Sequence, residues 1–332
     1  FYDPQHGAVY LDGVDLRNWP REALRSRISL CMQDVFLFGG RLEENISLGR
    51  RDLPPGAVVA TAGAMAYTDS AHGTHTASSA LGRGLGAAPE NTSGCGDVTP
   101  RRTTVRGAAP GALLATNNLF AGGLATVPGM MAWGARQGAL VSTNSWGLQG
   151  NASEVTSYSA ASAEVDAAVR DADPGAPGAE EIAVFFSAGN LGPDAGTVTA
   201  PGTAKSAITV GATQNGRCGS YVPARDDGPD PHRVLSSSSR GPSQGRLKPD
   251  LVAVGSDVLA AESAELEATS PWDEPWTGAG YALSSGTSMA CALAAGAGAV
   301  LVEAHHARTG RRPSPALVKA ALINGAVDLG GG

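Results

Sequence analysis

The sequence is poor in charged and aromatic residues, and it contains no block of basic residues. Charged residues make up 17% of the 332 positions and aromatic residues 5%, and the formal net charge is −7. Arg50-Arg51 and Arg101-Arg102 are too short to form a basic patch. Because nucleic acids and anionic membranes attract clustered positive charge, the composition argues against both as partners.

Cysteine is also scarce, and no apolar run is long enough to span a bilayer. Cys31, Cys95, Cys218 and Cys291 lie far apart and fit no metal-ligand spacing. We expect buried free thiols, with a disulfide between Cys95 and Cys218 as the alternative if the chain is exported. The apolar stretch 290–302 is short and interrupted by glycine, so we expect a helix of the protein core there.

What the chain does have is 45 glycines and a regular alternation of short apolar runs with helical patterns. Such alternation predicts an α/β fold, with a mostly parallel sheet and helices on both faces. The expected strands lie at 112–116, 139–143, 182–187 and 207–210, and the expected helices at 74–81, 155–172 and 288–307.

A break in composition at residues 50–55 predicts a domain boundary. The charged pair is followed by Pro54-Pro55, which can continue neither a helix nor a sheet. We therefore expect an N-terminal fragment over 1–51, a junction at 52–57 and a main domain over 58–332. Within the fragment, residues 7–16 predict a strand with an Asp-Gly turn, and residues 20–27 predict a short basic helix.

Three polar motifs occur in one order within the main domain. They are His72-Gly73-Thr74-His75, Ser187-Ala188-Gly189-Asn190 and Gly286-Thr287-Ser288-Met289-Ala290. In an open parallel sheet the ligand crevice lies at the carboxyl ends of the strands. Gly189-Asn190 follows one expected strand and Asn144-Ser145-Trp146-Gly147 follows another, so we expect both segments at that crevice.

The same motifs contain the residue types that nucleophilic catalysis requires. Ser288 stands where a glycine turn passes into a long helix, so its backbone N–H and the positive helix end can face a developing oxyanion. A serine hydroxyl needs a neighbouring base, for which His72 is the candidate and His75 a weaker one. The side chain of Asn190 offers a further oxyanion donor.

Alone, each motif has a structural interpretation as a helix cap or a strand-ending turn. Together, over about 58–332, they resemble the subtilisin-like serine proteases (subtilases, peptidase S8), and most closely the alkaline, oxidatively stable branch. The resemblance implies a serine endopeptidase with His72 as general base, Ser288 as nucleophile and Asn190 as oxyanion donor. It implies that the substrate contacts Ser145, Trp146, Gly147 and Gly189.

The resemblance also implies a protein or peptide substrate and an extracellular or periplasmic location, although no signal peptide is visible. Calcium sites are common in the family, so the resemblance allows calcium as a cofactor but implies none with certainty. No run of residues here is diagnostic of a metal site, and we interpret Asp226-Asp227-Gly228 and Asp230 as a solvated turn.

One part of the family's pattern has no counterpart. The family carries a catalytic aspartate at the end of an early strand, in an apolar run followed by Asp-Thr-Gly or Asp-Ser-Gly, and no such sequence lies between Pro54 and His72. We therefore expect this strand to be missing and activity to be impaired. Asp12, which has an apolar lead-in, and Asp69, one helical turn before the histidine, are the candidate substitute carboxylates.

Residues 1–49 resemble part of the ATPase domain of ABC exporters. The matching segments are Phe1-Tyr2-Asp3-Pro4, Leu11-Asp12-Gly13-Val14-Asp15-Leu16 and Met32-Gln33-Asp34-Val35-Phe36. The chain has no Gly-rich phosphate-binding loop with Lys and Ser or Thr, and no apolar strand ending in Asp-Glu, so ATP binding is not supported.

Two hypotheses about function remain open at this point. The first is a serine peptidase, impaired by the missing aspartate. The second is an inactive pseudoprotease, or a chimeric remnant, that binds extended peptides without cleaving them. A natural fusion, a recombined pseudogene and an assembly error each explain the joining of the two patterns.

Overall fold

The computed structural model describes residues 10–11, 14–18, 58–63, 70–84, 105–118, 126–148, 150–215, 230–262, 273–276 and 281–329. The chain divides into two compact units, residues 1–33 and 34–332. The expected boundary at residues 50–55 and the expected helix at 20–27 lie outside the described residues, and both stay predictions.

In the first unit, strands β1 (Tyr10–Leu11) and β2 (Val14–Asp15) form an antiparallel pair, with Tyr10 opposite Asp15. Both strands fall within residues 7–16, where a strand was predicted, whereas the predicted Asp-Gly turn at 12–13 lies outside the described residues. A 3-10 turn, η1 (Leu16–Asn18), follows directly. Its Arg17 donates two side-chain hydrogen bonds to the carboxylate of Asp15, which lowers the pKa of Asp15 to about 2.

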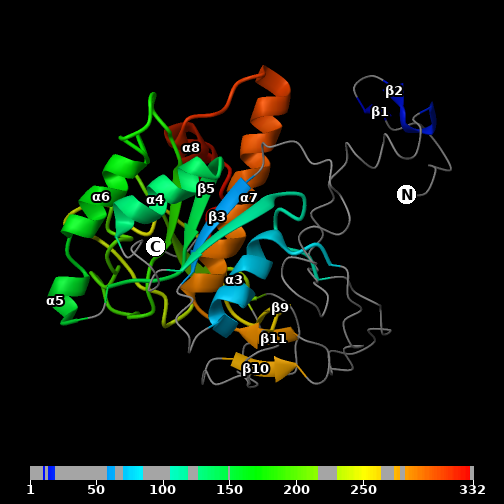
Figure 1. Ribbon diagram of the computed structural model, residues 1–332. Coiled ribbons are helices and arrows are strands. Elements are labelled where there is room, and N and C mark those ends of the chain that lie inside the picture. Colours follow the sequence, from blue (N-terminus) through cyan, green and yellow to red (C-terminus); the bar gives the residue numbers. More distant parts are fainter. Residues whose placement is uncertain are drawn as a thin grey trace, which may run out of the picture. The chain divides into compact units, whose positions relative to one another are not determined.

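The second unit is built on a six-stranded sheet whose neighbouring strands all run parallel (Figure 1). The parallel α/β architecture confirms the expected fold class. Its strands, in the order β4-β3-β5-β6-β7-β8 across the sheet, are β4 (Leu113–Asn118), β3 (Val58–Gly63), β5 (Ala139–Asn144), β6 (Ala183–Ser187), β7 (Ile208–Thr213) and β8 (Leu251–Val254).

Strand β3 corrects one expectation, because an early strand upstream of His72 is present. It lies inside the sheet between β4 and β5, and Ala62 pairs with Asn144 near the strand's carboxyl end. Its sequence, Val-Val-Ala-Thr-Ala-Gly, contains no acidic residue. The expectation failed because only Val58 and Val59 are strongly apolar, and the four small residues after them weaken the strand signal.

The domain has two hydrophobic cores, one on each face of the main sheet, and alternate side chains of β6 enter one or the other. Phe185 faces a cluster formed with α3 (Ser70–Leu81), α7 (Thr287–Thr309) and α8 (Pro315–Asn324). Val184 and Phe186 face the opposite cluster, which contains α4 (Val127–Arg136) and α6 (Ala160–Ala168). Because side chains alternate across a strand, one apolar run supplies both cores, and helices cover both faces of the sheet as expected (Figure 1).

The expected helix at 155–172 is two helices in the structure. A short helix, α5 (Ala152–Val155), is followed by α6, whose N-cap Ser159 and N3 residue Ser162 form a capping box. Ser157 and Ser159 interrupt the pattern, because hydroxyl side chains compete for backbone hydrogen bonds and favour a new helix start.

A second, antiparallel sheet lies beside α3. It contains β9 (Val258–Ala261), β10 (Asp273–Trp276) and β11 (Tyr281–Ser284), in the order β10-β11-β9. Buried His75 places its Nε2 2.9 Å from the carbonyl oxygen of Val258 and 3.1 Å from that of Ala282. His75 therefore joins α3 to this sheet, and its environment is structural.

Helix α7 is longer than expected. By length and composition it could cross a membrane, but more than half of its most apolar stretch is buried inside the domain, as in a core helix. Cys291 on α7 is a buried free thiol, as predicted, and burial raises its pKa to about 11. Cys31, Cys95 and Cys218 lie outside the described residues.

A buried ionic cluster ties α8 to the edge of the main sheet. Asp250 accepts hydrogen bonds from the Nζ of Lys248 at 2.7 Å and forms an ion pair with the Nζ of Lys319 at 2.8 Å. Lys248 also donates to the carbonyl oxygen of Ala207 and to the hydroxyl of Thr209. Burial lowers the pKa of Lys248 to about 8, although the charge of Asp250 opposes this shift.

The lowered pKa of Lys248 predicts that the free energy of unfolding rises at alkaline pH. Lys248 has a folded-state pKa of about 8 and an ordinary value of 10.5, so the folded protein binds fewer protons between these pH values and unfolding is disfavoured as pH rises. Relative to Lys248→Met, the wild type should gain about 3 kcal/mol between pH 8 and pH 10.5. Urea unfolding of both proteins across this range measures the difference, and a constant difference would contradict the shifted pKa.

Candidate active site

The residues singled out in the sequence gather where the parallel strands end. Ser145 follows β5 directly and Gly189-Asn190 follows β6 after one residue. Gly286 donates its backbone N–H to the carbonyl oxygen of Gly255, just beyond β8, at 2.6 Å. The segments predicted to carry the chemistry therefore meet at one edge of the sheet, in agreement with the crevice rule for parallel sheets.

Ser288 is the second residue of α7 and is 8% exposed. The N-cap of this helix is Gly286, which has a positive φ of 150° and offers no side chain to cap the first turn. The N-cap residue therefore covers none of the first backbone N–H groups, and among them the N–H of Thr287 is bound by the side chain of Asn190.

The orientation of the Asn190 side chain is fixed by Thr287. The backbone N–H and the hydroxyl of Thr287 both donate to Oδ1 of Asn190, each at 3.0 Å. The same hydroxyl accepts the backbone N–H of Gly189 at 3.2 Å. Because Oδ1 is held by two donors, the Nδ2 group of Asn190 is directed away from Thr287 and can donate to a ligand.

Ser145 connects the end of β5 to the first turn of α7. Its hydroxyl donates to the backbone carbonyl oxygen of Ser288 at 2.8 Å. Trp146, the next residue, packs edge-to-face against Phe186, with ring centroids 5.2 Å apart, and its Nε1 donates to Oδ1 of Asn144. The predicted substrate segment is therefore anchored on the same elements as the predicted nucleophile.

Glycine and threonine form a narrow wall beside this segment. Gly189 has a positive φ of 102°, and a Cβ atom there would lie 2.6 Å from Oγ1 of Thr199. A Cβ atom at Gly147 would lie 3.0 Å from the same oxygen. Only glycine fits at both positions without displacing Thr199, so the wall requires backbone without side chains.

His72 lies in the first turn of α3, where it is half-buried. Helices α3 and α7 pack against each other, so the candidate base and the candidate nucleophile stand on neighbouring helices (Figure 1). Both lie in the first turns of their helices.

The candidate substitute carboxylates, Asp12 and Asp69, lie outside the described residues, as does the turn at 226–228. In the described part of the chain, no group of three or more His, Cys, Asp or Glu side chains is placed to hold a metal ion. Asp230 is described, and its carboxylate accepts the backbone N–H of His232.

Two contact residues were not singled out as functional from the sequence. Thr287 lies within the motif Gly286-Thr287-Ser288-Met289-Ala290, but no function was predicted for it. Thr199 lies in none of the three motifs. Only the position of Thr287 between Gly286 and Ser288 signalled its importance. Thr199 reaches the site because its backbone N–H bonds to the carbonyl oxygen of Ala188, a long-range contact with no local sequence pattern.

The sequence model of the Subtilase family matches residues 55–332, and the chain therefore belongs to the subtilase family. Serine protease AprX from Bacillus subtilis (strain 168) is 34% identical over 145 residues. That alignment covers 43% of this chain and 30% of AprX, so the chain spans under a third of this relative's length.

Solved structures show the same fold. The prenylagaramide maturation protease PagA has a TM-score of 0.53 at 20% identity, with 83% of this chain and 85% of PagA covered. Sphericase has a TM-score of 0.51 at 21% identity, with 85% of this chain and 89% of Sphericase covered. The subtilisin-like arrangement of the sheet and helices is therefore established for this chain.

A separate similarity connects the chain to ABC transporters, as the sequence predicted. The putative ABC transporter ATP-binding protein MG015 from Mycoplasma genitalium (strain ATCC 33530 / DSM 19775 / NCTC 10195 / G37) is 40% identical over 60 residues. The match covers 18% of this chain and 10% of MG015, so it concerns a small fragment of an ATP-binding protein.

The contacts of Thr287 predict a stability change. In Thr287→Val the side chain keeps its volume, but the partly buried N–H of Gly189 loses its acceptor and Asn190 loses one donor. We expect a cost of about 1–3 kcal/mol in the free energy of unfolding. Chemical denaturation measures it, with Thr116→Val as the control because Thr116 is an exposed threonine of β4. Equal losses in both variants would contradict the assigned hydrogen bonds.

Proposed function

We propose that the protein is a serine peptidase of the subtilase type. The proposal rests on the two hydrogen bonds from Thr287 to the side chain of Asn190. They hold a side-chain amide donor next to Ser288, in the first turn of α7. An amide donor and the positive end of a helix beside a serine form the environment that a tetrahedral oxyanion requires.

In this mechanism the hydroxyl oxygen of Ser288 attacks the peptide carbonyl carbon, and His72 accepts the hydroxyl proton. Nδ2 of Asn190 and the backbone N–H of Ser288 donate to the oxyanion that forms. His72 returns the proton to the leaving amine, which releases an acyl-enzyme. Water then attacks the ester by the same route and frees Ser288.

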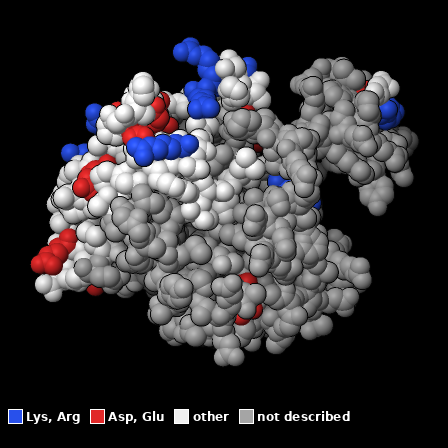
Figure 2. Space-filling model, viewed as in Figure 1, with Lys and Arg blue, Asp and Glu red and all other residues white. Residues whose placement is uncertain are grey.

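The proposed substrate is an extended peptide that pairs with the segment from Ser145 to Gly147. Strand addition of this kind uses backbone hydrogen bonds for affinity and pockets for specificity. On the face seen in Figure 2, acidic and basic side chains lie interspersed over the described surface, which supports a peptide rather than a polyanion as the partner. An extracellular or periplasmic location belongs to the same proposal.

The rate is expected to be low, because β3 offers no carboxylate to the histidine. An aspartate behind the imidazole holds its tautomer and stabilises the imidazolium, and loss of that support lowers the turnover rate by about 10⁴-fold. The same feature favours a second candidate function, a pseudoprotease that binds extended peptides without cleaving them. The two candidates differ in whether Ser288 is activated.

Labelling with a fluorophosphonate probe separates the two candidates. If His72 and the oxyanion donors act on Ser288, the purified chain should show slow, time-dependent labelling at Ser288 that disappears in Ser288→Ala. Mass spectrometry of the labelled peptide identifies the site. A folded chain that stays unlabelled but binds a substrate-like peptide would refute the peptidase and support the pseudoprotease.

Supplying the missing carboxylate should raise activity. Ala62 pairs in the sheet with Asn144, the residue before Ser145, so an aspartate at this position lies at the strand end nearest the site. We expect Ala62→Asp to increase the labelling rate at Ser288 by at least about tenfold, against a full recovery of about 10⁴-fold. The control is Gly63→Asp, whose side chain leaves the strand on the opposite face. If neither variant is faster than the wild type, β3 is not where the carboxylate acts.

A further inference from the structure

A cavity of about 280 Å³ lies at the opposite edge of the main sheet from the candidate active site. Ala139 and Ala183, the first residues of β5 and β6, line it, whereas the candidate active site begins beyond the last residues of these strands. β5 has six residues, so the two sites are separated by roughly 17 Å along the sheet. The cavity is therefore separate from the proposed chemistry.

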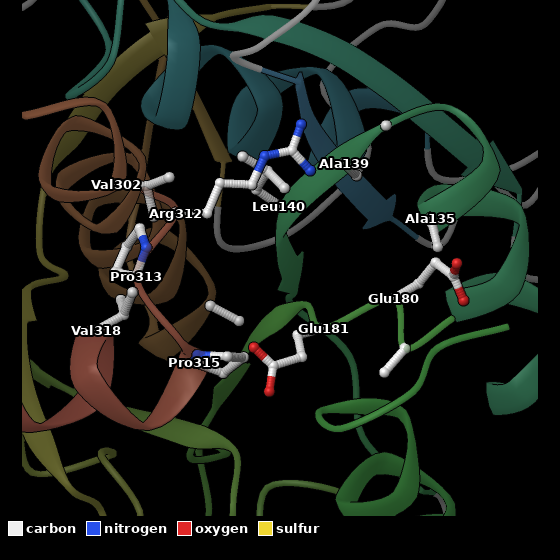
Figure 3. Close-up of a pocket in the computed structure, with 13 residues that line it drawn as sticks. Ala135, Ala139, Leu140, Glu180, Glu181, Val302, Arg312, Pro313, Pro315 and Val318 are labelled. Atoms are coloured by element: carbon white, nitrogen blue, oxygen red, sulfur yellow. The ribbon is translucent and has the colours of Figure 1, made fainter. Parts of the chain in front are cut away.

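The floor of the cavity is apolar. Val302 of α7 and Val318 of α8 are 7% and 1% exposed, and Leu140 and Pro313 complete this surface. Figure 3 shows Val302, Pro313 and Val318 on one side of the cavity, with Leu140 between them and Ala139. Such a floor offers a place for an aliphatic group.

The rim of the cavity carries charges of both signs. Arg312 extends toward Ala139 and Leu140, whereas Glu180 and Glu181 lie on the other side in the same view (Figure 3). None of these three side chains has a hydrogen-bond or ion-pair partner among the residues that the structure describes.

Glu180 supplies the second observation. Its Oε2 atom is buried and has no hydrogen-bond partner in the described structure. Glu180 as a whole is half-buried, and it lines the cavity. Its unpaired oxygen can therefore accept a hydrogen bond from a donor that enters the cavity. A cation or ammonium group in the cavity provides that donor.

Size and charge together define the ligand. A cavity of about 280 Å³ lies just below the usual range for ligand sites, which begins near 300 Å³, so it suits a molecule the size of one amino acid. We propose that this cavity binds a free amino acid with an aliphatic side chain. The ligand carboxylate pairs with Arg312, its ammonium group pairs with Glu180 and Glu181, and its side chain lies on Val302 and Val318.

The test is calorimetric titration of the whole chain with L-leucine. We expect saturable binding of one molecule per chain, weakened at least about tenfold in Arg312→Gln and in Glu180→Gln. Arg311→Gln is the matched control, because Arg311 is an exposed neighbour that does not line the cavity. Arg312 is also exposed, so its replacement leaves the core intact.

Two analogues of leucine assign the contacts. Leucinamide lacks the carboxylate, so Arg312→Gln should leave its affinity unchanged. 4-Methylpentanoate lacks the ammonium group, so Glu180→Gln should not weaken its binding. Absence of saturable binding up to on the order of 10 mM leucine, or equal affinity in Arg312→Gln and Arg311→Gln, would overturn the proposal. Tighter binding of Leu-Leu than of leucine would also overturn it, since a dipeptide exceeds the cavity.

Discussion

Helix α7 lies close against the parallel sheet, through a buried face made mostly of small residues. A Cβ atom at Gly298 would lie 2.5 Å from Cζ of Phe185, and Ala290 and Ala295 are fully buried. This close approach fixes the height of α7 above β5 and β6, and it therefore fixes where Ser288 meets Asn190. The contacts of Ser145 and Thr287 with the same turn follow from that placement.

The parts of the fold that the sequence predicted are those with a strong local signal. Apolar runs identified β5, β6 and β7 to within a few residues, and the small apolar pattern identified α7. The candidate site could be placed because Asn190 follows β6 and Ser288 lies in the first turn of α7, and both elements have a strong local signal. Strand β3 was not predicted, because a strand of small residues is specified by its neighbours in the sheet rather than by its own side chains.

The features that the sequence did not predict depend on contacts between different segments of the chain. Thr199 joins the candidate active site through a backbone pairing with Ala188, and the charged cavity is assembled from β5, β6, α7 and α8. Neither arrangement leaves a motif, since each residue involved is ordinary in its local sequence. The start of α6 depends on the capping box of Ser159 and Ser162, which is visible only when the backbone geometry is known.

The ionic cluster around Asp250 has a consequence for the order in which the domain is made. Lys248 and Asp250 lie beside the last strand of the main sheet, whereas Lys319 comes from α8, which follows the whole of that sheet in the chain. Because α8 comes after every strand of this sheet in the chain, Asp250 can pair with Lys319 only after α8 has been made. The core cluster that supports α7 is complete only when residues 315–324 have left the ribosome, so the proposed nucleophile gains its final support after nearly all of the described chain exists.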